Sequence, residues 1–254
     1  TGGWANAFLI ASLHERAHRL PPMPNPESVP NWLKGVFWEF QFATPILFRY
    51  GGEADAYIDH LERWFSVLLA DIEGKDGPAL GSAHAAAERV HAHVFCYFSD
   101  RSLHDVMLNA RRFQAYQIEQ DGHMLAHDFP KKSLNARRRL GFYRDRWSGT
   151  ELLFVLPILR HLDRNSFEIV LFADQTDGSD EEKLCRGYAD TFVELPEDLS
   201  QAVSKIRSFD LDLLMVATFL GQARDRRVQL AMHRLARRQA TYFTSPATSG
   251  MPHM

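Results

Sequence analysis

The stretch Arg138-Arg139-Leu140-Gly141-Phe142-Tyr143 decides the fold of this chain, because the sequence changes its pattern there. The preceding residues, 121–137, contain glycine, proline and several basic side chains, which is typical of an exposed linker. Beyond this stretch, strand-like apolar runs alternate with helical patterns. We expect strands at 138–144, 167–173, 191–195, 211–217 and 240–244, and helices that begin near Thr150, Asp180, Leu199 and Asp225. Such alternation predicts βαβ units and a parallel sheet covered by helices on both faces.

The residues before the linker predict helices only. Apolar residues recur at helical spacing over 4–20, 28–42, 53–72, 82–98 and 102–120. The clearest of these segments is 53–72, where one apolar stripe contains Tyr57, Ile58, Leu61, Trp64, Phe65, Leu68 and Leu69. The expected fold class is therefore α + α/β: an all-helical N-terminal domain, residues 1–132, followed by a Rossmann-like parallel-sheet domain, residues 133–254.

Composition and charge exclude several classes of function. The net charge of -3 gives no general attraction to nucleic acid or to an anionic membrane. Cys96 and Cys185 lie far apart, with neither a disulfide framework nor a Cys-x-x-Cys metal spacing, so we expect reduced thiols in a cytoplasmic protein. The longest apolar run, 152–159, is much shorter than the roughly 20 residues of a membrane-spanning helix. We expect no membrane span.

One metal motif is present in the helical half. His14, Glu15 and His18 match His-Glu-x-x-His, which on a helix places two imidazoles on one face for zinc and a glutamate beside them. This pattern indicates a zinc metalloprotease as a third hypothesis. Arg16 and Arg19 place positive charge next to the proposed cation, and no clear third ligand follows, so we assign no metal site. The three histidines His84, His91 and His93 are better explained as part of a solvated or partly buried helix face.

The loops at the carboxyl ends of the expected strands are where a parallel sheet binds its ligands. These loops are 144–150, 174–179, 218–224 and 244–254. The usual nucleotide and hydrolase signatures, Gly-x-Gly-x-x-Gly, Gly-x-x-x-x-Gly-Lys-Ser/Thr and Gly-x-Ser-x-Gly, are absent from the sequence, which disfavours a standard dehydrogenase, a P-loop enzyme and an α/β-hydrolase. The basic residues Arg111, Arg112 and 137–139 are interpreted as solvated charge, with phosphate contact as the alternative.

Three stretches of residues 137–254 occur in a recognisable order: the opening strand 138–143, the helix and strand of 156–169 (LPILRHLDRNSFEI) and the strand 209–214 (FDLDLL). In this order they resemble the first lobe of the catalytic region in the O-linked N-acetylglucosamine transferase family, which includes SPINDLY-type enzymes and bacterial adhesin N-glycosyltransferases. The most specific likeness is between 237–254 (RRQATYFTSPATSGMPHM) and the family pattern RPAPVQ…GYPGTSG.P.MDY.

That resemblance implies a two-lobed (GT-B) glycosyltransferase of bacterial type, in which the second lobe grips the nucleotide-sugar. The sequence stops inside the closing motif at Met254, so we expect the donor-binding lobe to lie outside it. Two departures accompany the likeness. The family's HPxGH-like loop is replaced by Asp145 to Glu151, without the histidine, and the bacterial GHT after the fourth strand is replaced by Thr218-Phe219-Leu220.

The resemblance and the loop positions together give the candidate site. Glu151 is the expected catalytic base, since a carboxylate can deprotonate an acceptor hydroxyl or polarise an amide. A capped helix N-terminus explains the same Ser-Gly-Thr-Glu sequence. Acceptor or phosphate contacts are expected from Asp145, Thr150, Thr248, Ser249 and Gly250, although a plain turn explains the last three.

Two main functions are compatible with these patterns. The first is the N-terminal part of a nucleotide-sugar-dependent protein glycosyltransferase, with a nucleotide-sugar as co-substrate, an acceptor protein as partner and no further cofactor. The second is a non-catalytic protein-binding module that keeps the lobe as a scaffold. Under the first function the helical domain would present the acceptor protein or support a homo-oligomer.

Overall fold

The computed structural model describes residues 3–21, 26–74, 80–88, 90, 97–131, 137–150, 152–220, 224–242 and 248–254. Its internal contacts divide the chain into two compact units. The first comprises residues 1–116 and 221–224, and the second comprises residues 117–220 and 225–254. Residues 117–131, which we expected in the helical domain, therefore belong to the second unit. The domain boundary at 132/133 stays a prediction.

The first unit is helical, as expected. Its α-helices are α1 (Gly3–His14), α2 (Asn31–Gln41), α3 (Glu53–Glu73), α4 (Gly81–Ala87) and most of α5 (His104–Gln120), with 3-10 turns at Ala17–Arg19 and Pro26–Ser28. Every residue of the stripe expected on α3 is buried. An aromatic cluster packs against it, in which the Trp38 and Trp64 rings lie edge to face at 4.8 Å between centroids. Burial of the amphipathic face of α3 thus organises this unit.

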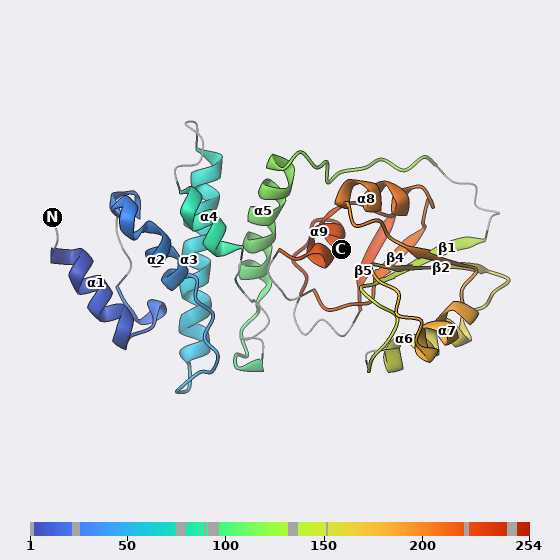
Figure 1. Ribbon diagram of the computed structural model, residues 1–254, viewed down its shortest axis with the longest axis horizontal. Coiled ribbons are helices and arrows are strands. Elements are labelled where there is room, and N and C mark those ends of the chain that lie inside the picture. The colour runs from blue at the N-terminus through green and yellow to red at the C-terminus, as the bar shows by residue number, and fades with distance from the viewer. Residues whose placement is uncertain are drawn as a thin grey trace. The chain divides into compact units, whose positions relative to one another are not determined.

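The second unit contains five parallel strands in the order β3-β2-β1-β4-β5. They are β1 (Arg138–Arg144), β2 (Phe167–Ala173), β3 (Thr191–Glu194), β4 (Leu213–Val216) and β5 (Arg238–Thr241). The helices between them are α6 (Leu152–His161), α7 (Asp180–Gly187), α8 (Leu199–Arg207) and α9 (Arg226–Met232). α6 and α7 cover one face of the sheet, and α8 and α9 cover the other (Figure 1). The parallel-sheet fold expected from the sequence is therefore confirmed.

Local sequence explains where these helices begin. Side chains of three residues cap helix N-termini by accepting a backbone N–H: Ser179 from Glu182, Asp198 from Gln201 and Asp225 from Val228. Such caps satisfy amides that have no partner inside the helix. They fix the direction in which the chain leaves the carboxyl ends of the strands.

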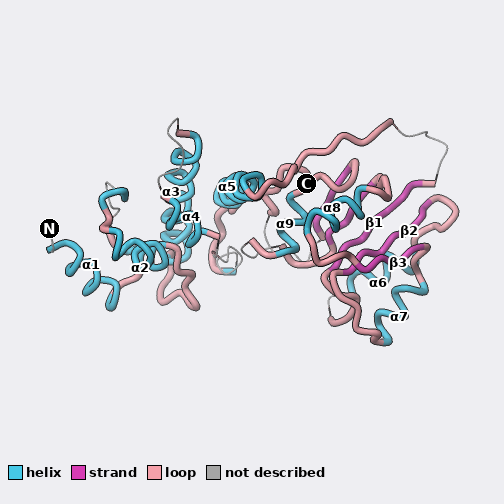
Figure 2. Tube along the Cα trace, turned by 45° about the horizontal axis from the view of Figure 1, so that its top comes forward, coloured by secondary structure: helices cyan, strands magenta, loops and turns pink. Residues whose placement is uncertain are grey.

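The centre of the sheet is tightly packed around β1, which pairs with β2 over seven residues and with β4 over four (Figure 2). A Cβ atom placed on Gly141 would meet the Leu211 Cδ1 atom at 2.5 Å and the Leu214 Cδ1 atom at 3.0 Å. Only a glycine lets the neighbouring side chains approach β1 this closely. Cys185 is buried in the core on the opposite face, and burial raises the pKa of its thiol to about 11, so the thiol stays protonated. Cys96 lies outside the described residues.

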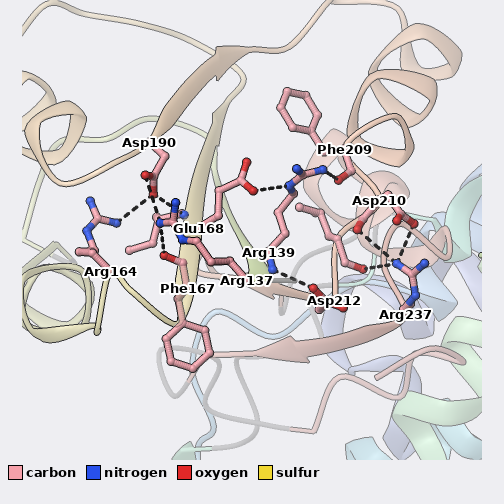
Figure 3. Close-up of polar contacts among 12 residues, drawn as sticks. Arg137, Arg139, Arg164, Phe167, Glu168, Asp190, Phe209, Asp210, Asp212 and Arg237 are labelled. Carbon is pink, nitrogen blue, oxygen red and sulfur yellow. Dashed lines mark hydrogen bonds and ion pairs between the residues drawn. The ribbon is translucent and has the colours of Figure 1, made fainter. Parts of the chain in front are cut away.

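The amino ends of the strands carry the basic run for which solvated charge and phosphate contact were both open. Arg137 pairs with Asp190, Arg139 pairs with Glu168, and Arg237 pairs with Asp210 (Figure 3). The Arg139 guanidinium also donates to the Phe209 carbonyl oxygen. These arginines are therefore neutralised by carboxylates of the same edge rather than left as free solvated charge.

Candidate functional site

The carboxyl ends of β1 and β4 form the switch point of this sheet, because the chain leaves β1 toward β2 on one side and returns to β4 on the other. Asp145 follows β1 and Thr218 lies just after β4. The Thr218 hydroxyl donates to Asp145 Oδ1 at 3.3 Å. Thr218 is buried, whereas the Asp145 side chain is 36% exposed. Asp145 is thus a partly exposed carboxylate in the position where open α/β sheets bind ligands.

A second carboxylate at the same edge is fully engaged. The Tyr143 hydroxyl donates to Asp174 Oδ2 at 2.6 Å, and Arg226 Nε donates to Asp174 Oδ1 at 2.8 Å. Burial, reinforced by the negative charge of Asp174, raises the pKa of Tyr143 well above its usual value. The phenol therefore stays protonated, and Asp174 serves to hold Arg226 and Tyr143 in place.

Arg227 supplies positive charge beside Asp145. Its guanidinium donates from Nε and from a terminal nitrogen to Asp225 Oδ2, at 3.0 and 2.7 Å, and approaches Asp145 Oδ2 at 3.9 Å. Partial burial lowers the pKa of Arg227, but Asp225 and Asp145 together raise it on balance. Asp225 also caps α9. The site therefore combines a carboxylate, a guanidinium and a helix N-terminus.

The loop after β1 is anchored by buried side chains. The Arg144 guanidinium donates to the Arg146 and Ala217 carbonyl oxygens at 3.0 and 2.9 Å. The buried Trp147 indole donates to the Phe172 carbonyl oxygen at 2.9 Å. These bonds hold the backbone of residues 145–147 in one conformation, which is the kind of support that a preorganised site needs.

The residues expected in the site occupy different places. Asp145 lies at the β1/β4 switch point, and Thr150 is exposed just before α6, where its carbonyl accepts the Leu153 N–H at 3.2 Å. Glu151, the expected base, lies outside the described residues. Thr248, Ser249 and Gly250 belong to the C-terminal segment, whose His253 is close to Arg234, just after α9, while Asp145 is close to Arg227 at the start of α9. The roles of all six residues stay predictions.

The sequence analysis assigned no role in the site to Tyr143, Asp174, Thr218, Arg226 or Arg227. A signal for them existed, because Asp174 and Thr218 begin two of the loops expected to bind ligands and the two arginines open an expected helix. What the sequence lacked was the strand order, which decides that the loops after β1 and β4 are neighbours.

The geometry on which the zinc hypothesis rested is absent. α1 ends at His14, and His18 lies in a separate 3-10 turn, so the two imidazoles do not share a helical face. His18 Nε2 instead lies 3.1 Å from Oε1 of the buried Glu53, which also accepts from Arg16. Within the described part of the chain, no three His, Cys, Asp or Glu side chains gather in a metal-binding arrangement. The metalloprotease interpretation of His14 and His18 was wrong because the motif is not helical.

The fold combines a helical unit with a Rossmann-like lobe that carries polar side chains at its switch point, which is the architecture of the first lobe of a GT-B glycosyltransferase. No protein-family model matches this chain, and no curated protein matches its sequence. Among solved structures, the chain is similar to a mutant of the O-GlcNAc transferase of Thermobaculum terrenum, with a TM-score of 0.53 and 17% identity over 79% of this chain. At this identity the likeness shows the fold alone.

The match to this transferase structure reaches beyond the second unit of the chain. The second unit makes up only about half of the chain, so a match over 79% extends into the helical unit. This chain covers 38% of the chain of that transferase, well under two thirds of its length. In the described residues no helix is both long and apolar enough to cross a membrane.

Proposed function

We propose that this chain is the N-terminal part of a nucleotide-sugar-dependent protein glycosyltransferase that works in the bacterial cytoplasm. The observation that carries the proposal is the likeness of fold to an O-GlcNAc transferase across both units. The polar side chains at the β1/β4 switch point support it, because that is where such a sheet places its ligands. The co-substrate would be a nucleotide-sugar, with no metal or other cofactor, and the partner an acceptor protein that the helical unit presents.

The proposed reaction is a direct displacement at the anomeric carbon of the sugar. An acceptor oxygen or nitrogen forms the new bond to this carbon, and the bond to the nucleoside diphosphate breaks, so that the diphosphate leaves with the bonding electrons. Glu151 takes the proton of the acceptor. Asp145 and Thr150 hold the acceptor, while Thr248, Ser249 and Gly250 contact the acceptor or the phosphates.

The test is sugar transfer by the complete natural polypeptide that contains this chain. A panel of nucleotide-sugars is offered with a cell extract, and incorporation into protein is followed by intact-mass and peptide mass spectrometry. Glu151→Gln should lower kcat by at least about 100-fold, because loss of a general base typically costs that much. Asp145→Asn should raise KM for the acceptor. Glu119→Gln, an exposed carboxylate on α5, is the matched control and should leave both constants unchanged.

A non-catalytic protein-binding module is the second candidate. Two observations favour it: the family histidine is missing from the loop after β1, and Asp174 is occupied by Tyr143 and Arg226. Stable binding of a protein partner, together with no transfer from any nucleotide-sugar, would select this function. If the Glu151→Gln protein is fully active, the proposed transferase function stands and only the proposed role of Glu151 as the base is contradicted.

A further inference from the structure

A group of basic side chains lies on the α8/α9 face of the second unit, where residues 121–129 cross it. The Arg234 N–H donates to the Leu125 carbonyl oxygen at 2.8 Å, which fixes this segment on the end of α9. His123 Nδ1 lies 3.3 Å from the Ser200 hydroxyl oxygen of α8, and its ring packs edge to face on His233 at 5.7 Å. The segment thus brings His123 beside Ser200, near the start of α8, and beside His233, which directly follows α9.

Arg207, the last residue of α8, holds the crossing segment through carbonyl oxygens. Its Nε donates to the Arg234 carbonyl at 3.0 Å, and one terminal nitrogen lies 3.2 to 3.3 Å from the carbonyl oxygens of Met124, Leu125 and Ala126. Desolvation lowers the pKa of Arg207. No described carboxylate bonds this guanidinium, so its charge is not compensated by an ion pair.

Three further groups have unused hydrogen-bond capacity. The Arg234 guanidinium and the rings of His127 and His253 form no hydrogen bond or ion pair with a described residue, and all three residues are half-buried. We call the group of His123, His127, Arg207, Arg234 and His253, with His233 beneath it, the histidine–arginine patch. Among the described carboxylates, the one whose field reaches His127 is that of the exposed Asp128.

The electrostatics of the patch show an excess of positive charge. Burial lowers the pKa of His253, and the charges of Arg234 and Arg207 lower it further. Burial and the same two arginines also lower the pKa of His127, although the charge of Asp128 opposes this effect. Arg207 and Arg234 are permanent cations to which no described carboxylate is bonded. Imidazoles with unused ring nitrogens lie next to them. Together these groups offer hydrogen-bond donors and positive charge to a ligand. That ligand is a compact, multiply charged oxyanion.

We propose that the histidine–arginine patch binds a phosphate group, held by the Arg234 guanidinium with the His127 and His253 rings as additional donors. The group is either free inorganic phosphate or the terminal phosphate of a nucleotide, since both present the same oxygens. The patch is separate from Asp145 and Thr218, which follow the carboxyl ends of β1 and β4, because Arg207 and Arg234 lie at the ends of α8 and α9, where the chain returns to the amino ends of β4 and β5. The proposal does not depend on the transferase activity.

The experiment is a titration of this 254-residue chain with inorganic phosphate, pyrophosphate and a nucleoside diphosphate at constant ionic strength. Imidazole signals of His127 and His253 are followed by NMR. We expect saturable shifts, and a rise of about one unit in the pKa of both rings on binding, since a nearby negative charge favours the imidazolium form. Tighter binding of the nucleoside diphosphate than of pyrophosphate would identify a nucleotide as the source.

Matched variants decide whether the site is built or incidental. Arg234→Met should weaken phosphate binding by at least about tenfold, and Arg234→Lys should restore only part of it, because a lysine lacks the planar fork. Arg238→Met removes an exposed arginine outside the patch and should leave binding unchanged. The backbone N–H of Arg234 keeps its bond to Leu125 in these variants, and amide spectra verify the fold. Non-saturable shifts, or equal losses in Arg234→Met and Arg238→Met, would overturn the proposal.

Discussion

The amino edge of the sheet and the histidine–arginine patch both contain several arginines, but only at the amino edge are the arginine charges compensated by carboxylates. At the amino edge, Arg137, Arg139 and Arg237 each have a carboxylate partner within 3.4 Å (Figure 3). In the patch, Arg207 bonds only carbonyl oxygens among the described residues, and the Arg234 guanidinium bonds none of them. Compensated arginines contribute to folding, whereas uncompensated ones raise the local potential and are available to an anion.

The largest expected difference between the regions is in their response to acid. Burial lowers the pKa of His233, beneath the patch, to about 4, against an ordinary value of 6.5. As pH falls from 6.5 to 4, the His233 imidazole binds a proton in the unfolded chain but not in the folded chain. The free energy of unfolding therefore decreases through that pH window. At pH 4 the loss should be about 3 kcal/mol.

Hydrogen exchange of the β4 and β5 amides between about pH 7 and pH 4, corrected for intrinsic rates, measures this loss. His233→Asn, whose amide can still donate to the Gln229 carbonyl, should remove most of the pH dependence. At the amino edge the Asp190 pKa is lowered on balance: burial raises it, but the Ile169 N–H and Arg164 and Arg137 outweigh that effect. An unchanged pH profile in the variant would contradict the assignment to His233.

The second expectation concerns the carboxylates of the two regions. Asp190 accepts the Ile169 N–H at 2.8 Å and pairs with Arg137 and Arg164, so Asp190→Ala leaves a strand amide and two cations without their acceptor. The loss of stability should be about 2 kcal/mol. Asp128→Ala in the patch should change stability by less than about 0.5 kcal/mol. Urea unfolding of both variants measures their free energies of unfolding. Equal losses in the two variants would contradict the expected difference between the regions.

The smallest expected effect compares one arginine from each region. Arg237 pairs with Asp210 at 2.7 Å and donates to the Pro130 carbonyl at 2.6 Å, and it supports a turn in which Asp210 has a φ of 51°. Arg237→Met should cost about 1 kcal/mol, mostly at low salt because the ion pair is partly exposed. Arg234→Met should cost less than about 0.5 kcal/mol. Urea titrations in low and high salt separate the two.

Much of the fold could be predicted because its signals are local. Short stretches of sequence determine the apolar stripe of α3 and the strands that begin at Arg138 and Phe167. The same holds for the helix caps at Ser179, Asp198 and Asp225. The His-Glu-x-x-His motif misled because its meaning depends on a helix that ends at His14. Motif spacing alone does not report where a helix stops.

The site was less predictable because it depends on distant pairs. The bond between Asp145 and Thr218 joins residues 73 positions apart, and only the strand order makes them neighbours. The same holds for the basic run at 137–139, whose carboxylate partners lie far along the chain. The patch is assembled from residues 123, 127, 207, 234 and 253, and no periodicity in a single sequence links those positions.

The central place of β1 has a consequence for synthesis on the ribosome. β1 pairs on one side with β2, which follows soon after it, but its other side is closed only by β4, after α6, α7, β3 and α8 have been made. During that interval a strand that is destined for the centre of the sheet presents an open edge, which is a template for wrong pairing between nascent chains. The rate at which residues 145–212 emerge and fold should therefore govern the yield of native protein more than the final stability does.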